Sequence, residues 1–583
     1  MLHTLTRSLR ENKGPALVTV LLSALEVVFE IVIPLFMSNL IDFGIEGGSM
    51  AAVWKFGAFL LLLAAFQLST GVLAARIAAR ASVGFAANLR EDMYDNVQTF
   101  AFSNIDKFST ASIVTRLTTD TTNVQNAFQM LMRMAIRAPV MLIFSMIVSF
   151  RISRDISMTF LIILPILALA LFFIIRSVFP VFSRVFRTYD ELNNVVQENV
   201  RGIRVVKSFN QERHEIGKFG AISERIYQDF SKGERLITLN APLMQFCIYT
   251  CMIVISWLGA KAIIASGNDP ALGFTTGNLT ALITYTMQIL SSLMMLSMVF
   301  AMLTISLSSA RRIAEVLEER SDIPQPEQPV MTVRDGAVDF DHVSFVYASK
   351  TDKKVLDDID LHIHSGETIG IIGGTGASKS SLVQLIPRLY DVTGGKLTLG
   401  GVDVRDYDLD TLRGAVAMVL QKNELFSGTI KENLRWGNEN ATDEELRHAC
   451  ELACADGFIS AMPDGYDTHI EQGGTNVSGG QKQRLCIARA LLKKPKVLIL
   501  DDSTSAVDTR TDAQIQQALS TYIPDTTKII IAQRISSVQN ADRIVVLDDG
   551  RINAVGSHDE LLRSCEIYRE VYESQQKGGE DDA

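Results

Sequence analysis

The chain has 583 residues, of which 48 % are hydrophobic and 21 % are charged, and its formal net charge is −10. This acidic balance excludes a protein that depends on a basic surface to bind nucleic acid, and the length requires more than one domain. The mean hydropathy of +0.20 is high for a chain whose last third has the composition of a soluble α/β protein, so we expect the first half to lie in a membrane.

Six apolar runs occur in the first half, each long enough to cross the hydrocarbon layer, which takes about 20 residues. They cover roughly residues 15–42, 54–75, 132–150, 156–178, 237–264 and 278–308. The first run is too long for a cleavable signal peptide and lacks a small-residue cleavage site, so it is predicted to span. The long connections after the second and fourth runs keep helical periodicity, which predicts helices that continue well beyond the bilayer.

The distribution of positive charge predicts the orientation of these helices. Lysine and arginine are concentrated in the connections 76–131 and 179–236 and are absent from the predicted outer loops 43–52 and 265–277. The positive-inside rule therefore places both termini and both long connections in the cytosol. Arg151 and Arg154, in a short loop, run against this rule but are outnumbered.

Two groups of residues in the membrane half are candidates for contact with a substrate. Glu26 and Glu30 lie four residues apart on one face of the first helix, and acids inside a bilayer are costly and usually functional. They favour a cationic substrate, although an inter-helix hydrogen bond or the wall of an aqueous cavity would also explain them. The sixth helix offers a soft methionine surface suited to apolar ligands, but methionine is also common in spanning helices. These methionines are Met287, Met294, Met295, Met298 and Met302.

The connections carry a family resemblance. The segments FSTASIVTRLTTDT (108–121) and VVQENVRGIRVVKSFNQE (195–212) resemble the two intracellular loops of the ABC exporter membrane domain. The resemblance extends from about residue 15 to 573. It implies six long helices with cytosolic extensions, and short coupling helices near 104–112 and 205–216 that dock on an α/β P-loop ATP-binding domain.

The domain boundaries follow from composition. We expect a transmembrane domain over 1–322, a linker over 323–335, an ABC nucleotide-binding domain over 336–576 and an acidic flexible tail over 577–583. The linker is predicted because Pro324, Pro326 and Pro329 interrupt any helix there.

A phosphate-binding loop is predicted in IGIIGGTGASKSSLVQLI (369–386), which has the form of a strand, a glycine-rich turn and a helix. Its backbone N–H groups would cradle phosphate oxygens, Lys379 would add positive charge, and Ser380 would offer its hydroxyl to Mg²⁺. Ser378 stands where the strict motif has glycine, and its side chain would crowd the loop if the backbone requires a positive φ. The remaining predicted nucleotide contacts in this loop are Gly373, Gly374, Thr375, Gly376, Ala377 and Ser381.

Other motifs occur in the order that the resemblance predicts. By this resemblance Tyr347 in VSFVYASK would stack on adenine, and Gln421 would contact Mg²⁺ and face the coupling helices. The segment NVSGGQKQR (476–484) is similar to the ABC signature, which lies at a helix start and grips the γ-phosphate of nucleotide held by the other subunit. Its candidate contacts are Ser478, Gly479, Gly480 and Gln481.

Two positions depart from the family pattern. In KVLILDDSTSAVD (496–508), Asp501 is the expected Mg²⁺ residue, but Asp502 occupies the place of the glutamate that activates water. In KIIIAQRISSVQNAD (528–542), Gln533 occupies the place of the switch histidine. Aspartate is one methylene shorter than glutamate, and glutamine can donate a hydrogen bond but carries no positive charge.

These departures predict a site that binds ATP and Mg²⁺ and hydrolyses ATP poorly. The chain therefore resembles the degenerate-site subunit of a bacterial heterodimeric ABC exporter, an ATPase of the plasma membrane that moves amphipathic drugs or lipids. The partner would be a second half-transporter with glutamate and histidine in place. Two other hypotheses stay open: an importer of the same architecture that takes up metal chelates, and a regulatory subunit that binds ATP as a signal.

Overall fold

The computed structural model describes residues 1–270, 273–347, 354–374, 376–502 and 507–580. These residues form two compact units. The first consists of Met1–Gln98 and Ala111–Glu319, and the second consists of Thr99–Thr110 together with the chain from Arg320 onward. We call them the membrane unit and the ATPase unit.

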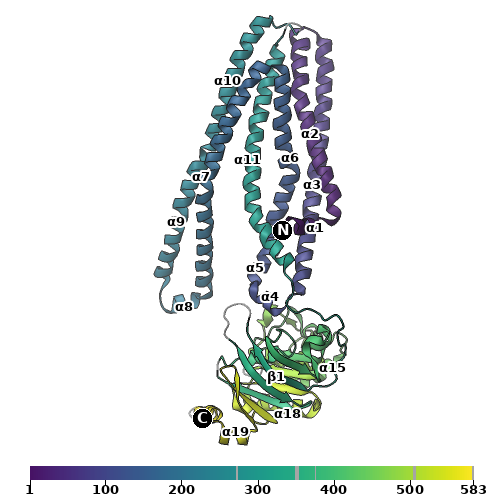
Figure 1. The fold of residues 1–583 in the computed structure, drawn as a ribbon, viewed down its shortest axis with the longest axis vertical. Helices are drawn as coiled ribbons and strands as arrows, with labels where there is room; N and C mark the ends of the chain where they lie inside the picture. The colour runs from purple at the N-terminus through teal and green to yellow at the C-terminus, as the bar shows by residue number, and fades with distance from the viewer. Residues whose placement is uncertain (271–272, 348–353, 375, 503–506, 581–583) are drawn as a thin grey trace. The chain divides into compact units, whose positions relative to one another are not determined.

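The membrane unit is entirely helical (Figure 1). Six of its helical segments are long and apolar enough to cross a membrane among the described residues, which confirms the predicted number. The long helices are α2 (Lys13–Asn39), α3 (Met50–Gln98), α6 (Thr121–Ile152), α7 (Arg154–Arg201), α10 (Asn240–Ser266) and α11 (Thr276–Glu318). The shorter elements are α1 (Leu2–Arg7), η1 (Arg10–Asn12), η2 (Leu40–Glu46), α5 (Thr110–Thr115), η3 (Arg116–Asp120), α8 (Ile203–Ser208) and α9 (Glu212–Thr238).

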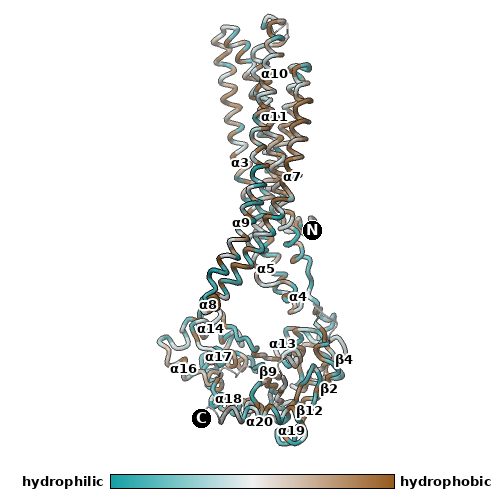
Figure 2. The backbone as a smooth tube through the Cα atoms, turned by 90° about the vertical axis from the view of Figure 1, so that its left-hand side faces the viewer, coloured by the Kyte–Doolittle hydropathy of each residue, from teal (hydrophilic) through white to brown (hydrophobic). Residues whose placement is uncertain are grey.

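Several of these helices are far longer than a bilayer requires. Helix α3 has 49 residues and α7 has 48, whereas about 20 residues span the hydrocarbon layer. Helices α7 and α9 run side by side and are joined through α8 (Figure 1). Figure 2 shows that hydrophobic residues follow α7, α10 and α11, whereas much of α9 is hydrophilic. The polar extensions of these helices therefore suit an aqueous environment outside the bilayer, as the sequence predicts.

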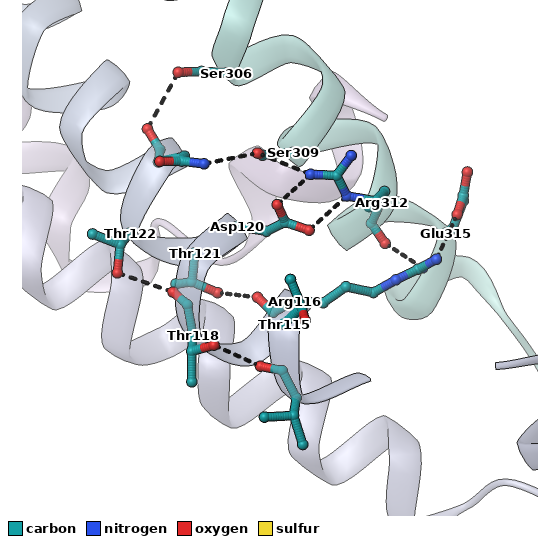
Figure 3. A network of polar contacts seen from close by, with 12 residues as sticks. Thr115, Arg116, Thr118, Asp120, Thr121, Thr122, Ser306, Ser309, Arg312 and Glu315 are labelled. Carbon is teal, nitrogen blue, oxygen red and sulfur yellow. Dashed lines mark hydrogen bonds and ion pairs between the residues drawn. The ribbon is translucent and has the colours of Figure 1, made fainter. Parts of the chain in front are cut away.

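Packing in the membrane unit joins α2, α6 and α11, and separately joins α7, α10 and α11. Val27, Met141 and Tyr285 form the centre of the first cluster, and Phe160, Ile255 and Ile289 belong to the second. A polar network below the first cluster links η3 to α11 (Figure 3). This network holds the last turns of α11, which lead to the ATPase unit along the chain.

The ATPase unit contains a six-stranded sheet in the order β12-β11-β3-β10-β9-β6, parallel except for β12. Its interior strands β9 and β10 are buried at every position, as expected of parallel strands covered on both faces. The strands of this sheet are β3 (Thr368–Gly373), β6 (Val416–Val419), β9 (Val497–Asp501), β10 (Thr527–Ile531), β11 (Arg543–Asp548) and β12 (Arg551–Gly556).

A second, antiparallel sheet has the order β2-β1-β4-β5, and β7 pairs with β8. These strands are β1 (Val338–Phe345), β2 (Leu356–Ile363), β4 (Gly394–Leu399), β5 (Val402–Asp403), β7 (Gly428–Thr429) and β8 (His469–Ile470). The helices of the unit are α4 (Phe102–Lys107), α12 (Lys379–Gln384), α13 (Leu409–Ala415), α14 (Ile430–Arg435), α15 (Asp443–Leu452), α16 (Asp456–Ser460), α17 (Gly479–Leu492), α18 (Thr509–Tyr522), α19 (His558–Ser564) and α20 (Glu566–Glu580). A six-helix membrane domain followed by an α/β domain is the predicted fold class.

Helix α4 belongs to the ATPase unit although its sequence lies between two membrane helices. The Phe102 ring is 6.0 Å from the ring of Tyr390, and the Tyr390 hydroxyl donates to Asp106 at 2.8 Å. The Asn104 side chain donates to the Arg320 carbonyl at 2.9 Å. These contacts join α4 to Tyr390 and Arg320 within the ATPase unit.

Candidate nucleotide-binding site

The predicted phosphate loop, Asp501 and Gln533 meet at one edge of the six-stranded sheet. Strands β3, β10 and β9 are parallel neighbours, so their carboxyl ends lie together. Strand β3 ends at Gly373, β9 ends at Asp501, and Gln533 follows the end of β10 by two residues. Ligands of open α/β sheets bind at this edge, which here carries glycine, carboxylate and amide groups.

The loop after β3 has the backbone geometry of a phosphate cradle. Gly376 has a φ of +87° and Ser378 has a φ of +65°, both in the left-handed region. A non-glycine residue held there costs on the order of 1–3 kcal/mol, so the positive φ suspected for Ser378 is present and strained. Thr375 lies outside the described residues.

Lys379 opens helix α12 and turns back over the loop. Its ammonium donates to the carbonyls of Gly373 at 2.8 Å and Gly374 at 2.9 Å. Desolvation lowers the pKa of Lys379, against the opposing effect of Asp502 and Asp501. A phosphate entering the loop would give this ammonium a better acceptor than two neutral carbonyls.

Ser380 and Asp501 form the part of the site that suits a hard cation. The Ser380 hydroxyl donates to the Asp501 carboxylate at 3.0 Å. Burial raises the pKa of Asp501, which is 3 % exposed. Hydroxyl and carboxylate oxygens this close together are ligands that Mg²⁺ accepts, so the residues fit the cation that the sequence predicts.

Asp502 is the meeting point of the two glutamines that the sequence singles out. Gln533 donates its amide to the Asp502 carboxylate at 2.9 Å, and Gln421 donates to the same oxygen at 3.3 Å. Asp502 itself has a φ of +47°, and its N–H donates to the Ile531 carbonyl at 2.9 Å. The shorter acid is therefore held back toward the sheet by its backbone and by two neutral amides.

The predicted adenine platform lies beside the same loop. The Tyr347 hydroxyl is 2.9 Å from that of Ser381, and its ring stands edge-on to Phe345 and Tyr390 at 4.7 and 5.1 Å. Tyr390 also contacts α4 through Phe102, so aromatic rings connect α4 to Tyr347. Sequence reasoning missed Tyr390, whose only local signal is an aromatic residue soon after the predicted P-loop helix.

The signature residues lie at the start of helix α17. Ser478 is the N-cap, and its hydroxyl accepts the Gln481 N–H at 3.2 Å. The Gln481 side chain in turn accepts the Ser478 N–H at 2.9 Å. This reciprocal capping box fixes the turn that carries Gly479 and Gly480. The backbone amides at the start of α17 are thereby held in place to donate hydrogen bonds to an anion from outside this helix.

The two acids of the first membrane helix have a partner that the sequence reading missed. Arg137 of α6 donates to Glu26 at 2.8 Å and to Glu30 at 2.6 Å, so both acids form an inter-helix ion pair. A signal was available, because Arg137 is one of two arginines, with Arg133, within the apolar run 132–150. On α11, Met287, Met294 and Met298 are exposed in the single chain.

Comparison with known proteins shows the family to which the chain belongs. Residues 16–308 match the family described as ABC transporter transmembrane region, and residues 356–505 match the family described as ABC transporter. The chain is 35 % identical over 558 residues to the ABC transporter ATP-binding protein YfiB of Bacillus subtilis, covering 96 % of each. It is 31 % identical over 527 residues to the ATP-dependent lipid A-core flippase of Desulfotalea psychrophila, covering 88 % of this chain and 89 % of the flippase.

A solved structure shares the fold. A bacterial Atm1-family ABC exporter with ATP bound superposes with a TM-score of 0.79 at 24 % identity, covering 97 % of this chain and 98 % of the exporter. The arrangement of a helical membrane domain and an ATPase domain is thus common to both proteins.

Proposed function

Since this chain belongs to the ABC transporters, with an exporter-type membrane domain and an ATPase coupled to transport, we propose that it is one half of a heterodimeric exporter whose own ATP site is the weaker of two. The single observation that carries this proposal is the group of Asp502, Gln533 and Gln421. Asp502 is shorter than the glutamate of the family pattern, and Gln533 lacks the positive charge that a histidine can carry, whereas Gln421 matches the pattern and donates to Asp502 beside Gln533.

The same residues support ATP binding without fast hydrolysis. Lys379 and the loop amides would hold the phosphates, and Tyr347 would hold the base. Ser380 and Asp501, with Gln421 nearby, would hold Mg²⁺, which neutralises charge between the phosphates. Asp502 is one methylene shorter than glutamate, and misplacing a catalytic group by about 1 Å can cost on the order of 100-fold in rate.

Assembly into a dimer is supported by apolar surfaces that a single chain leaves open. On α8 and just after it, Val205 is 60 % exposed and Phe209 is 71 % exposed. In the ATPase unit, Phe426 and Trp436 stack at 4.1 Å beside a cleft of about 350 Å³ and remain exposed. A dimer would cover such surfaces, and Ser478, Gly479 and Gln481 would then serve the partner's ATP site.

The substrate class follows from the ion pair between α2 and α6. Two carboxyl groups face a single guanidinium, and the Glu30 side chain is 23 % exposed. This excess favours a cationic or zwitterionic amphiphile, either a drug or a lipid, over an anionic one. The relative named as a lipid A-core flippase is consistent with an amphipathic cargo. The proposed orientation places both termini and the ATPase unit in the cytosol of a bacterial cell.

The experiment that tests the proposal compares ATP turnover by the purified chain with turnover by a mixture of the chain and its candidate partner half. We expect the chain alone to be slow, because two copies pair two weak sites. The double substitution Asp502→Glu with Gln533→His should raise the chain's own turnover by at least about tenfold. Equal turnover by the chain alone and by the mixture would contradict the heterodimer proposal.

The alternative readings have separate tests. A substrate-dependent rise of accumulation in cells would indicate an importer. Transport into vesicles that is unchanged when the chain is deleted would indicate a regulatory subunit.

A further inference from the structure

The loop that carries Gln533 is held from outside by the C-terminal helix. Gln575 of α20 accepts the Ile535 N–H at 2.9 Å and donates its amide N–H to the Gln533 carbonyl at 2.7 Å. One side chain thus pairs with the backbone on both sides of Arg534, in the manner of a neighbouring β-strand. This is a defined two-point contact, and a hydrogen bond at each point fixes the direction of the loop.

The other end of the loop is fixed as well. Ser537 donates to Asp512 of α18 at 2.6 Å, and both side chains are buried. Between these two anchors lies the short helix η7 (Ile535–Ser537), whose Ile535 packs in the domain core. The backbone at Gln533 therefore depends on Gln575 for its outer support, since the second anchor lies four residues further along.

Helix α20 is itself firmly attached to the domain up to this point. Tyr568 is fully buried and its hydroxyl is 2.7 Å from the His558 ring nitrogen. Val571 and Tyr572 pack against the same core as Ile535. Gln575 follows Val571 by one helical turn, so the core places its side chain level with the loop. The core therefore fixes α20, and α20 in turn fixes the backbone position of Gln533.

The position of Gln533 matters because its side chain ends at the catalytic acid. Its amide donates to Asp502 at 2.9 Å, while its own carbonyl receives the Gln575 amide. We infer that Gln575 is a positioning residue for ATP hydrolysis, which acts by fixing the backbone of Gln533 so that the Gln533 amide meets Asp502 and the γ-phosphate. The inference requires ATP hydrolysis by this domain, and it holds whether the site is fast or slow.

The chain offers a matched control in the next residue. Gln576 is also an exposed glutamine of α20, but its amide donates to the Tyr572 hydroxyl at 2.8 Å and not to the loop. Replacement of either residue by alanine keeps a good helix former at an exposed position, so the fold should survive. Gln575→Glu separates the two contacts, because a carboxylate still accepts the Ile535 N–H but cannot donate to the Gln533 carbonyl.

The first measurement is amide hydrogen exchange in the purified full chain in lipid nanodiscs. The loss of one hydrogen bond should make the Ile535 amide exchange roughly three- to tenfold faster in Gln575→Ala and leave it unchanged in Gln576→Ala. Gln575→Glu should retain the slow exchange. Unchanged exchange at Ile535 in Gln575→Ala would overturn the inference.

The second measurement is single-turnover hydrolysis of radiolabelled ATP with the chain in excess, which resolves slow rates. Gln575→Ala and Gln575→Glu should each lower the rate by about three- to tenfold while ATP affinity stays within about twofold. The double variant Gln575→Ala with Gln533→Ala should be no slower than Gln533→Ala alone, because both act through one side chain. Independent losses that multiply, or an equal loss in Gln576→Ala, would overturn the inference. Failure of the heterodimer proposal would appear instead as fast turnover of the unaltered chain.

Discussion

The ion pair between Asp120 and Arg312 should be worth several times more than an ion pair on the surface of the same unit. Arg312 of α11 donates through two nitrogens to Asp120, at 2.7 and 2.5 Å (Figure 3). The Asp120 side chain is 2 % exposed, whereas that of Arg312 is 44 % exposed. Removal of one partner of a buried pair costs about 3–5 kcal/mol, and the partial hydration of Arg312 reduces this to about 1–3 kcal/mol for Asp120→Asn.

A double-mutant cycle isolates the pairwise part of that energy. The four chains are the unaltered protein, Asp120→Asn, Arg312→Gln and the double variant, each unfolded in mixed micelles by increasing detergent. The control cycle uses Glu198 and Lys218, a pair 3.2 Å apart with side chains 75 % and 39 % exposed, for which about 0.2–1 kcal/mol is expected. Equal coupling energies in the two cycles would refute the argument that burial and the two-nitrogen geometry make the Asp120 pair stronger.

Three further experiments test transport, coupling and stability. Gly479→Asp should nearly abolish vesicle transport by the assembled transporter, since a carboxylate at the start of α17 repels the partner's γ-phosphate. Asp502→Ala should lower transport far less. Equal losses would mean that the two sites hydrolyse ATP equally. Phe426→Ala should leave ATP binding intact but remove the stimulation of ATPase by substrate, and normal stimulation would contradict a transmitting role for the exposed cleft. Although burial opposes it, hydrogen bonds from Arg543 and a backbone amide hold the pKa of Glu367 below its ordinary value of 4.5. The stability that this pair contributes is therefore fully present above pH 4.5 and is lost as the pH falls through the lower folded-state pKa. The melting temperature of the ATPase unit should therefore fall with acid less steeply in Glu367→Gln than in the unaltered protein.

The elements of this protein were predictable because their signals are local. Six apolar runs predict six spanning helices, and a strand, glycine turn and lysine predict the phosphate loop without any knowledge of distant residues. The positive φ of Ser378 was also foreseeable, since the motif places glycine there. Such features depend on composition and on positions a few residues apart.

The contacts that organise the site were not predictable, because they join residues far apart in the chain. Arg137 is separated from Glu26 by 111 residues, and Gln575 from Gln533 by 42. Periodicity assigns each of these residues to a helix face or a loop but does not say which other element it meets. Gln575 was further hidden because it is exposed and lies in an ordinary amphipathic helix.

Because α4 belongs to the ATPase unit, it is synthesised long before the residues on which it packs. Asp106 and its partner Tyr390 are 284 residues apart, which corresponds to roughly 14–57 s at about 5–20 residues per second on the ribosome. During that interval α4 has left the ribosome with its aromatic Phe102 and has nothing of its own unit to pack on. A substitution at Tyr390 would then act first on the yield of assembled protein in the membrane, before any effect on nucleotide chemistry.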